Sequence, residues 1–284
     1  MKKQISTIIT VIVFVTGLSL LLYPTVSNYW NSLHQTKAVA NYSDAMEKMD
    51  KQKKQDAIDA AKAYNEALLS NAGRFTPTEE ELDTYKSLLN ADGTGMMGYI
   101  EIPEIRCELA IYHTVDESVL QVGIGHLEGS SLPVGGSGTH CVLSGHRGLP
   151  SAKIFTDLDQ MKNGDIFLIH VLGKTLAYKV DQIKTVLPEE SSELDIIEGE
   201  DHVTLVTCTP YGVNTHRLLI RGIRTEYVEP EEEAEETPIQ QIAKVDPVKI
   251  MIIGLVAMVI MIIIVYIVIR RKSRKTEESS RKDE

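Results

Sequence analysis

The sequence lacks features that mark several large protein classes. It has only three cysteines in 284 residues, which excludes a small fold held together by disulfides. It has no P-loop, no dinucleotide-binding fingerprint and no internal repeat. Positive charge is also scarce, since 29 Lys and Arg stand against 40 Asp and Glu, and this argues against a nucleic-acid partner. A coiled coil and a multi-pass transporter are excluded as well.

Two long uncharged runs predict membrane spans. Ile5–Tyr23 has 19 residues and Ile250–Ile269 has 20, and neither contains a charge. Basic residues lie on the terminal side of both runs, with Lys2 and Lys3 before the first and Arg270 directly after the second. The positive-inside rule therefore predicts a cell-membrane protein with both termini in the cytoplasm and the middle of the chain outside the cell.

The first run has a second interpretation, a cleaved signal peptide whose basic region is Lys2 and Lys3. Its apolar stretch is longer than usual for a signal peptide, and no clear small-x-small cleavage site follows Tyr23. We favour an uncleaved signal anchor.

Between the spans, the pattern changes from helical to strand-like near Gly98. Lys37–Ala72 predicts a helix that is solvated and packs weakly on the domain or continues from the membrane. Gly73–Gly98 is rich in turns around a short helical run, Glu79–Leu89, and we interpret it as a loop or lid rather than core. Further short helices are expected at Glu117–Val122 and Lys153–Met161.

Seven or eight short runs rich in Val, Ile, Leu and Thr follow, separated by turn residues, and they predict a closed or nearly closed β-barrel. The expected strands are Tyr99–Pro103, Cys107–His113, Thr139–Ser144, Asp165–Val171, Thr175–Leu187, Val203–Thr207 and Arg217–Tyr227. An acidic, proline-bounded linker then carries seven Glu within Glu226–Glu236. The predicted order is a cytoplasmic N-terminus at 1–4, a signal-anchor span at 5–23, a helical segment with a lid at 37–97, a barrel at 98–228, an acidic linker at 229–249, a span at 250–269 and a basic cytoplasmic tail at 270–284.

Cys208 is the candidate nucleophile. It ends an apolar strand and precedes Thr209 and Pro210, so its thiol is expected at the rim of the barrel. Cys107 and Cys141 lie inside strand-like runs and are expected to be inert core residues, with a disulfide between them as the alternative.

A thiol nucleophile needs a partner that handles its proton, and eight histidines are available. His146 is favoured because it follows a strand within a glycine-bounded turn, Ser144–Gly148, which holds the imidazole over the rim. His126, in another glycine-rich loop, is the second choice, whereas His140 and His170 fall within strands and are expected at the core edge or surface.

Arg217 is the candidate for stabilising an oxyanion, because arginine stays charged and its guanidinium suits carbonyl oxygens. It lies on the strand expected to pair antiparallel with that of Cys208, close to the connecting loop. For Arg221 and Arg224 we prefer a solvated surface role.

These motifs resemble the signature of sortases, the cysteine transpeptidases of Gram-positive cell surfaces. The matching features are Thr204–Cys208, which reads TLVTC, the turn Ser144–Gly148, and Arg217 nine residues after the cysteine. The resemblance extends from about Gly98 to Arg224, and the loops and second span are most similar to class C, the pilus-assembly branch.

The resemblance implies an eight-stranded barrel that cleaves an LPxTG-type sorting signal between Thr and Gly. Cys208 would form an acyl-thioester, His146 would act as general acid and then base, and Arg217 would hold the substrate. A Lys amine of another pilin subunit would resolve the thioester, and no metal or organic cofactor is implied. Pilin subunits and the membrane are the expected partners, with cell-wall precursors or a housekeeping sortase pathway as further ones. The protonation state of the Cys208 and His146 pair stays open.

One feature departs from class C, whose lid commonly carries an Asp-Pro-aromatic motif. The corresponding stretch, 71–86, has no Asp-Pro pair, and Phe75 or Tyr85 is left as the candidate aromatic plug. An autoinhibitory lid is therefore a hypothesis.

Three alternatives remain open: a sortase that anchors proteins to cell-wall peptide, a surface-anchored adhesin or pilin, and a papain-type thiol hydrolase. The adhesin would need an LPxTG-like motif before the second span, and 236–249 has none. The strand-rich pattern argues against the papain type.

Overall fold

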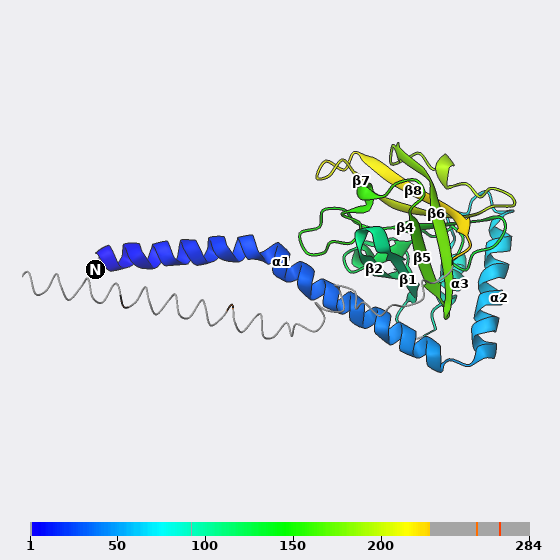
Figure 1. Ribbon diagram of the computed structural model, residues 1–284, viewed down its shortest axis with the longest axis horizontal. Helices are drawn as coiled ribbons and strands as arrows, with labels where there is room; N and C mark the ends of the chain where they lie inside the picture. The colour runs from blue at the N-terminus through cyan, green and yellow to red at the C-terminus, as the bar shows by residue number, and fades with distance from the viewer. Residues whose placement is uncertain (1, 92, 228–253, 255–266, 268–284) are drawn as a thin grey trace, which may run out of the picture. The chain divides into compact units, whose positions relative to one another are not determined.

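The computed structural model describes residues 2–91, 93–227, 254 and 267. Eight strands form a closed barrel in the order β1-β2-β3-β4-β7-β8-β6-β5, and β1 and β5 pair to complete it (Figure 1). The strands are β1 (Met96–Ile102), β2 (Cys107–His113), β3 (Ile124–His126), β4 (Thr139–Ser144), β5 (Ile166–Val171), β6 (Lys174–Val186), β7 (Asp201–Thr209) and β8 (His216–Thr225). The predicted barrel is therefore confirmed, and β3 is a strand that the sequence pattern did not reveal.

Two of the strand pairs are parallel, β2 with β3 and β4 with β7, and the others are antiparallel. The β4–β7 pair matters most for function, because it places two strands far apart in the sequence side by side with their C-terminal ends at the same edge.

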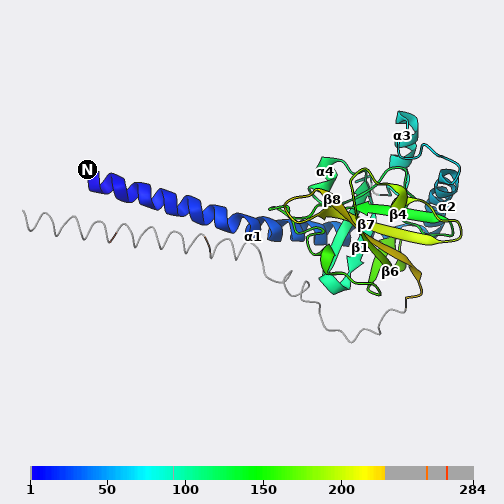
Figure 2. The ribbon, with the colours of Figure 1, turned by 90° about the horizontal axis from the view of Figure 1, so that it is seen from above.

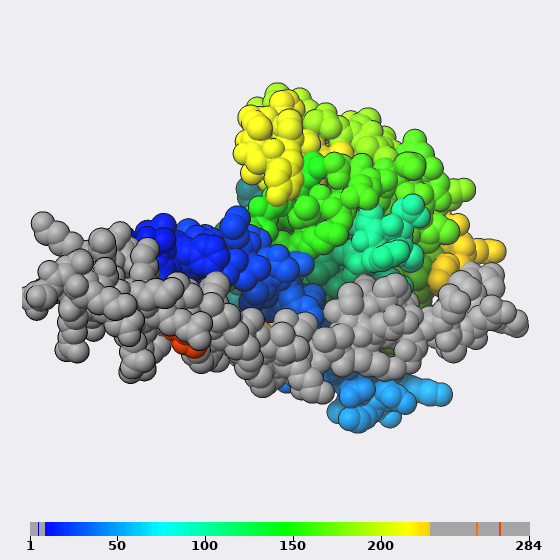
Figure 3. All heavy atoms as spheres, turned by 60° about the vertical axis from the view of Figure 1, so that its left-hand side comes forward, coloured from blue at the N-terminus to red at the C-terminus, as the bar shows by residue number. Residues whose placement is uncertain are grey.

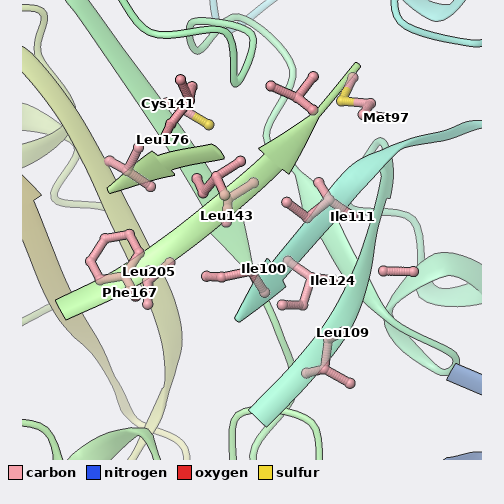
Figure 4. Packing of buried hydrophobic residues seen from close by; sticks show 14 of the residues in the cluster. Met97, Ile100, Leu109, Ile111, Ile124, Cys141, Leu143, Phe167, Leu176 and Leu205 are labelled. Carbon is pink, nitrogen blue, oxygen red and sulfur yellow. The ribbon is translucent and has the colours of Figure 1, made fainter. Parts of the chain in front are cut away.

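Alternating apolar residues of these strands fill the barrel. Leu143, Phe167 and Leu205 converge between the strands in Figure 4 and are fully buried. Burial of a side chain of this size contributes about 1.5–3 kcal/mol, so this interior fixes the strands that carry the candidate site.

The N-terminal region forms two helices rather than the single one predicted over Lys37–Ala72. Helix α1 (Lys2–Lys48) joins the predicted span to the predicted helix, and α2 (Lys51–Leu68) follows after a break. Asp50 causes this break, because its carboxylate accepts hydrogen bonds from the backbone N–H groups of Gln52 and Lys53 and so caps a new helix.

The expectation that these helices pack weakly is wrong. On α1, Val39, Tyr42 and Met46 are buried against the barrel. The Tyr42 hydroxyl donates to the carbonyl of Met97 at 2.8 Å and accepts from the N–H of Leu172 at 2.9 Å, so it links α1 to two parts of the domain.

Helix α3 (Glu79–Ser87) lies in the region that we interpreted as loop or lid rather than core, but it buries one residue, Tyr85, in the core. It begins with a capping box between Thr78 and Glu81. Its Tyr85 is 1% exposed and lies against the rings of His113 and His126. Figure 2 shows α3 beside α2 at one side of the barrel.

The shorter elements are α4 (Glu117–Leu120) and the 3-10 turns η1 (Pro103–Ile105), η2 (Leu158–Gln160) and η3 (Ser192–Leu194). The helix expected at Glu117–Val122 is thus confirmed, and only η2 forms within the one expected at Lys153–Met161.

One helix in the described part of the chain, Ile9–Lys48, is long and apolar enough to cross a membrane by length and composition. The second predicted span, the acidic linker at 229–249 and the tail at 270–284 fall almost entirely outside the described residues.

Candidate active site

The candidate site forms where β4 and β7 end together. Ser144 pairs with Val206 in the parallel register, and the N–H of Gly145 donates to the carbonyl of Val206 at 3.0 Å. His146 and Cys208 each lie two residues beyond this pair. Since neighbouring strands run about 4.8 Å apart, the register brings the imidazole and the thiol to the same level of the same edge.

The turn that carries His146 is held closely on both sides. A side chain at Gly145 would place its Cβ 2.7 Å from the ring of Phe155, so only glycine fits there without movement. The backbone carbonyl of His146 accepts from the N–H of Phe155 at 3.1 Å. The backbone of His146 is therefore fixed by packing and by a hydrogen bond.

Cys208 is distinct from the other two cysteines, all three of which are free thiols. Burial raises the pKa of Cys107 to about 12 and that of Cys141 well above its ordinary value. Burial thus disfavours both thiolates at neutral pH, in keeping with the expectation that these two cysteines are inert, and both are free thiols in this structure. Cys208 is half-buried, as is Cys107, but it lies at the rim of the barrel beside the candidate histidine turn and remains the candidate nucleophile.

Arg217 lies directly opposite Cys208 in the antiparallel β7–β8 register, as the sequence predicts. Opposite residues of such a pair share a face, with Cβ atoms about 4.5–5.5 Å apart. The Arg217 guanidinium donates to the carbonyls of His216 at 3.2 Å and Asn214 at 3.4 Å. Its other donors remain for a ligand.

Arg221 belongs to a different environment. It pairs in register with Thr204 and donates to both carboxylate oxygens of Asp181. Arg221 lies four residues along β8 from Arg217 and is engaged by an acidic partner, which supports Arg217 as the functional arginine.

His126 is not available for proton transfer with solvent or substrate. It is fully buried, its Nε2 faces the carbonyl of Ser131 at 2.8 Å and its Nδ1 faces the hydroxyl of Tyr85 at 3.0 Å. Burial lowers the pKa of His126 to about 4, so the imidazole is neutral at physiological pH. Its glycine-rich loop surrounds a core residue, and the second choice for the catalytic histidine is thereby excluded.

Two residues at the site had no signal in the sequence. Glu117 on α4 places its carboxylate Oε2 3.4 Å from His146 Nε2. Arg147, next to His146, donates to the Thr209 hydroxyl at 3.3 Å, pairs with Asp159 and lies under the ring of Tyr211. Arg147 thus links the turn after β4 to the end of β7 and the loop that follows it. The contacts of Glu117 and of Arg147 form only in the tertiary structure.

The lid segment of the sequence prediction contacts the loop between β6 and β7. The Arg74 guanidinium donates to the carbonyl of Leu194 at 3.2 Å and pairs with Asp195 at 3.3 Å. It also lies over the ring of Phe75, 4.6 Å from the centroid. Gly129 permits this arrangement, because it has a φ of +81° and a Cβ there would be 1.9 Å from the carbonyl oxygen of Arg74.

The loop between β7 and β8 forms the other border of this edge. Figure 3 shows this region, in yellow, standing out from the barrel. Tyr211 and Val213 in the loop are 60% and 63% exposed. Among the residues that the structure describes, no group of three His, Cys, Asp or Glu side chains is placed to hold a metal ion.

Comparison with known proteins agrees with this geometry. Residues 100–225 match the family model described as Sortase domain. The crystal structure of sortase C1 from Streptococcus agalactiae is 49% identical, with a TM-score of 0.66, and the match covers 68% of this chain and 100% of that one. The chain belongs to the sortase family.

Two further solved sortases support class C. Sortase C of Streptococcus pneumoniae, whose structure is described as informing pilin substrate specificity, is 42% identical with a TM-score of 0.59, over 68% of this chain and 99% of that one. A lid-mutant of Streptococcus agalactiae sortase C1 is 42% identical with a TM-score of 0.58, over 66% and 96%.

The family assignment decides between the main alternatives. Sortases are cysteine transpeptidases of the cell surface that associate with the membrane, so the adhesin or pilin interpretation and the papain-type hydrolase are wrong. This sortase carries one apolar N-terminal helix in its described part, in keeping with that location.

Proposed function

We propose that this sortase is a membrane-anchored pilus polymerase that cleaves an LPxTG-type sorting signal between Thr and Gly. The observation that carries the proposal is the register of three strand ends, which brings His146, Cys208 and Arg217 to one edge of the barrel. The same edge is bordered by exposed loops, so an extended peptide can reach the thiol.

In the first half of the reaction, the Cys208 thiolate attacks the Thr carbonyl carbon and forms a carbon–sulfur bond. The tetrahedral intermediate collapses, the carbon–nitrogen bond to Gly breaks, and protonated His146 gives its proton to the departing amine. The Thr end of the pilin is left as a thioester on Cys208.

In the second half, a Lys amine of another pilin subunit attacks the thioester carbon. Neutral His146 accepts a proton from this amine, the carbon–sulfur bond breaks, and the thiolate returns to Cys208. The new isopeptide bond joins two subunits, and the residues are in their starting protonation states.

Arg217 stabilises the negative charge that develops on the carbonyl oxygen in both halves. Its position opposite Cys208 and its remaining guanidinium donors suit this role. Arginine keeps its charge at any physiological pH, so this contribution does not depend on proton transfer.

Polymerisation is favoured over anchoring to cell-wall peptide because of the class C relatives, one of which is described in terms of pilin substrates. Both termini are proposed to lie in the cytoplasm, with spans at 5–23 and 250–269 and the barrel outside the cell. A housekeeping sortase would then attach the finished fibre to cell-wall precursors.

We also propose that residues 71–78 form a lid that regulates access to the groove. Arg74 fastens this stretch to Leu194 and Asp195, and a hollow of about 490 Å³ lined by Tyr64, Pro77 and Thr84 separates it from α2 and α3. The aromatic partner would be Phe75, since Tyr85 is a core residue.

The test of the function uses the full chain in detergent micelles with an LPxTG-type peptide and intact-mass detection. A peptide adduct that ends at Thr and is absent from Cys208→Ala establishes the nucleophile and the cleavage site. Addition of a pilin domain with its Lys then distinguishes polymerisation from hydrolysis. Adduct formation at another cysteine, or cleavage by Cys208→Ala, would refute the mechanism.

A further inference from the structure

Glu117 lies against the candidate catalytic histidine without belonging to the strands that form the site. Its carboxylate Oε2 is 3.4 Å from His146 Nε2. That nitrogen is buried from solvent and makes no hydrogen bond among the described residues. A buried ring nitrogen normally needs a partner, and a small rotation of the Glu117 side chain supplies one.

The carboxylate is already oriented by a second contact. The side-chain amide of Gln121, the residue that caps the C-terminal end of α4, donates to Glu117 Oε1. One carboxylate oxygen is thus engaged by Gln121, and the other faces His146. This hydrogen bond, together with the charge of His146, lowers the pKa of the Glu117 carboxyl, which is ionised at neutral pH.

The backbone that carries Glu117 is fixed to the domain on both sides. Before it, the Thr114 hydroxyl donates to Asp116 at 2.9 Å, and the Thr114 N–H donates to the Tyr85 hydroxyl at 3.1 Å. After α4, Gln35 of α1 donates to the carbonyl of Val122 and accepts from the N–H of Ala110. Helix α4 is therefore a firm support for its carboxylate.

We propose that Glu117 is a positioning residue for His146: it accepts the Nε2–H, fixes that tautomer and leaves Nδ1 to exchange protons with the reacting amines. The inference rests on the proposed role of His146. Glu117 itself does not touch the substrate. Its effect is exerted on the orientation and charge of the imidazole.

The proton balance assigns each nitrogen one task. In the imidazolium both nitrogens carry hydrogen, and Nδ1 gives its proton to the departing Gly amine while Nε2–H stays on Glu117. The neutral ring then has a free lone pair on Nδ1 only, which accepts the proton of the incoming Lys amine. Without Glu117 the neutral ring can place its hydrogen on Nδ1, where it blocks the second half.

The chain supplies a matched control pair. Glu101 Oε2 lies 3.4 Å from His170 Nε2, the same separation, on strands β1 and β5. His170 stacks on Tyr99 and has no part in the proposed reaction. Glu101→Ala thus removes an equivalent carboxylate without touching the site.

The first experiment reads the tautomer directly in the full chain in detergent, labelled with ¹⁵N-histidine. Spectra are recorded at about pH 9, above the ordinary titration range of histidine, with His146→Gln used for assignment. We expect His146 as the Nε2–H tautomer in the wild type and in Glu117→Gln, whose side-chain oxygen still accepts. In Glu117→Ala we expect a mixture with the Nδ1–H form. An Nδ1–H form in the wild type, or an unchanged signal in Glu117→Ala, would overturn the proposal.

The second experiment measures transpeptidation. Because Glu117 is exposed, we expect Glu117→Ala to lower kcat by about tenfold with little change in KM, and Glu117→Gln by about threefold. Glu101→Ala should match the wild type. Equal kcat values for Glu117→Ala and Glu101→Ala would contradict the role of Glu117. An inactive wild type would instead refute the proposed function, and the tautomer spectra would still decide whether Glu117 positions the ring.

Discussion

Thr207 donates its hydroxyl hydrogen to the backbone carbonyl of Gly145 over 2.7 Å, and so ties the residue before the candidate nucleophile to the residue before the candidate general acid. Thr207 is 2% exposed, so water does not compete for this bond. The threonine that precedes the cysteine in the sequence motif thus has a structural role, which is to hold the turn of the candidate general acid against the strand of the candidate nucleophile.

Replacement of this threonine should affect both stability and turnover. Thr207→Val keeps the shape but leaves the Gly145 carbonyl without this donor, at a cost of about 1–3 kcal/mol in the free energy of unfolding. We also expect kcat to fall, because the Gly145 turn is freed relative to Cys208. Thermal unfolding and single-turnover acylation check this, with the exposed Thr185→Val as control. A variant as stable and as fast as the control would show that the bond contributes nothing.

Substitutions of the three candidate catalytic residues should separate them from their neighbours. Cys208→Ala should abolish acyl transfer, and His146→Ala and Arg217→Ala should each lower kcat/KM on the order of a hundredfold or more. Arg221→Ala should have a much smaller effect, since its guanidinium is engaged by Asp181. Steady-state transpeptidation of an LPxTG-type peptide measures this. A larger loss for Arg221→Ala than for Arg217→Ala would exchange their roles.

Acidification should destabilise the domain through its buried histidines. Burial lowers the pKa of His126 from 6.5 to about 4, and that of His140 likewise to about 4. The unfolded chain takes up these protons first, so the stability present above about pH 6.5 is lost as the pH falls toward 4. Each histidine should remove about 2 kcal/mol of unfolding free energy between pH 7 and pH 5.

Denaturant titrations at several pH values measure this slope. His126→Gln cannot titrate, so the dependence on pH should become shallower by the contribution of one group, whatever the absolute stability of the variant. A slope equal to that of the wild type would mean that His126 has the same pKa in the folded and the unfolded chain.

The lid proposal predicts faster access to the thiol when its fastening is removed. Arg74→Ala loses the bonds to Leu194 and Asp195, and we expect alkylation of Cys208 to accelerate by about threefold, as is reasonable for a partly exposed pair. Deletion of Gly73–Lys86 is a poor test, because it removes the core residue Tyr85. Mass spectrometry of iodoacetamide-treated protein gives the rate, with Lys86→Ala as control. An unchanged rate would show that the segment does not restrict the thiol.

Strands are predictable where an apolar run rich in strand-forming residues continues over several positions, as in 107–113 and 139–144, which the structure reproduces at the same bounds. The β3 strand gives no signal in the sequence because three residues, Ile124–His126, are too few to show a period. The break at Asp50 is not visible in the sequence pattern because a helical pattern continues on both sides, and only the capping hydrogen bonds in the structure show that a new helix begins.

The positions of Cys208, Arg217 and His146 at one edge of the barrel can be predicted from the sequence, because each residue lies at or beside the end of a predicted strand. The burial of Tyr85 and the approach of Glu117 to His146 cannot be predicted in this way. Each of these residues contacts an element that is distant in the sequence, so its environment depends on the whole tertiary structure. Nothing about a tyrosine or a glutamate in the sequence indicates burial in the core or contact with a histidine.

The continuity of α1 restricts how this enzyme can be re-engineered. Asn28 accepts from the N–H of Lys153 at 2.8 Å, and Asn31 donates to the carbonyl of Ser151 at 2.6 Å, in the connection that follows His146. An exchange of the apolar N-terminal segment for another must therefore join upstream of Ser27, which also contacts Ser151. A version that starts at Ala38 discards these contacts and that of Gln35, and with them part of the scaffold behind the candidate catalytic histidine.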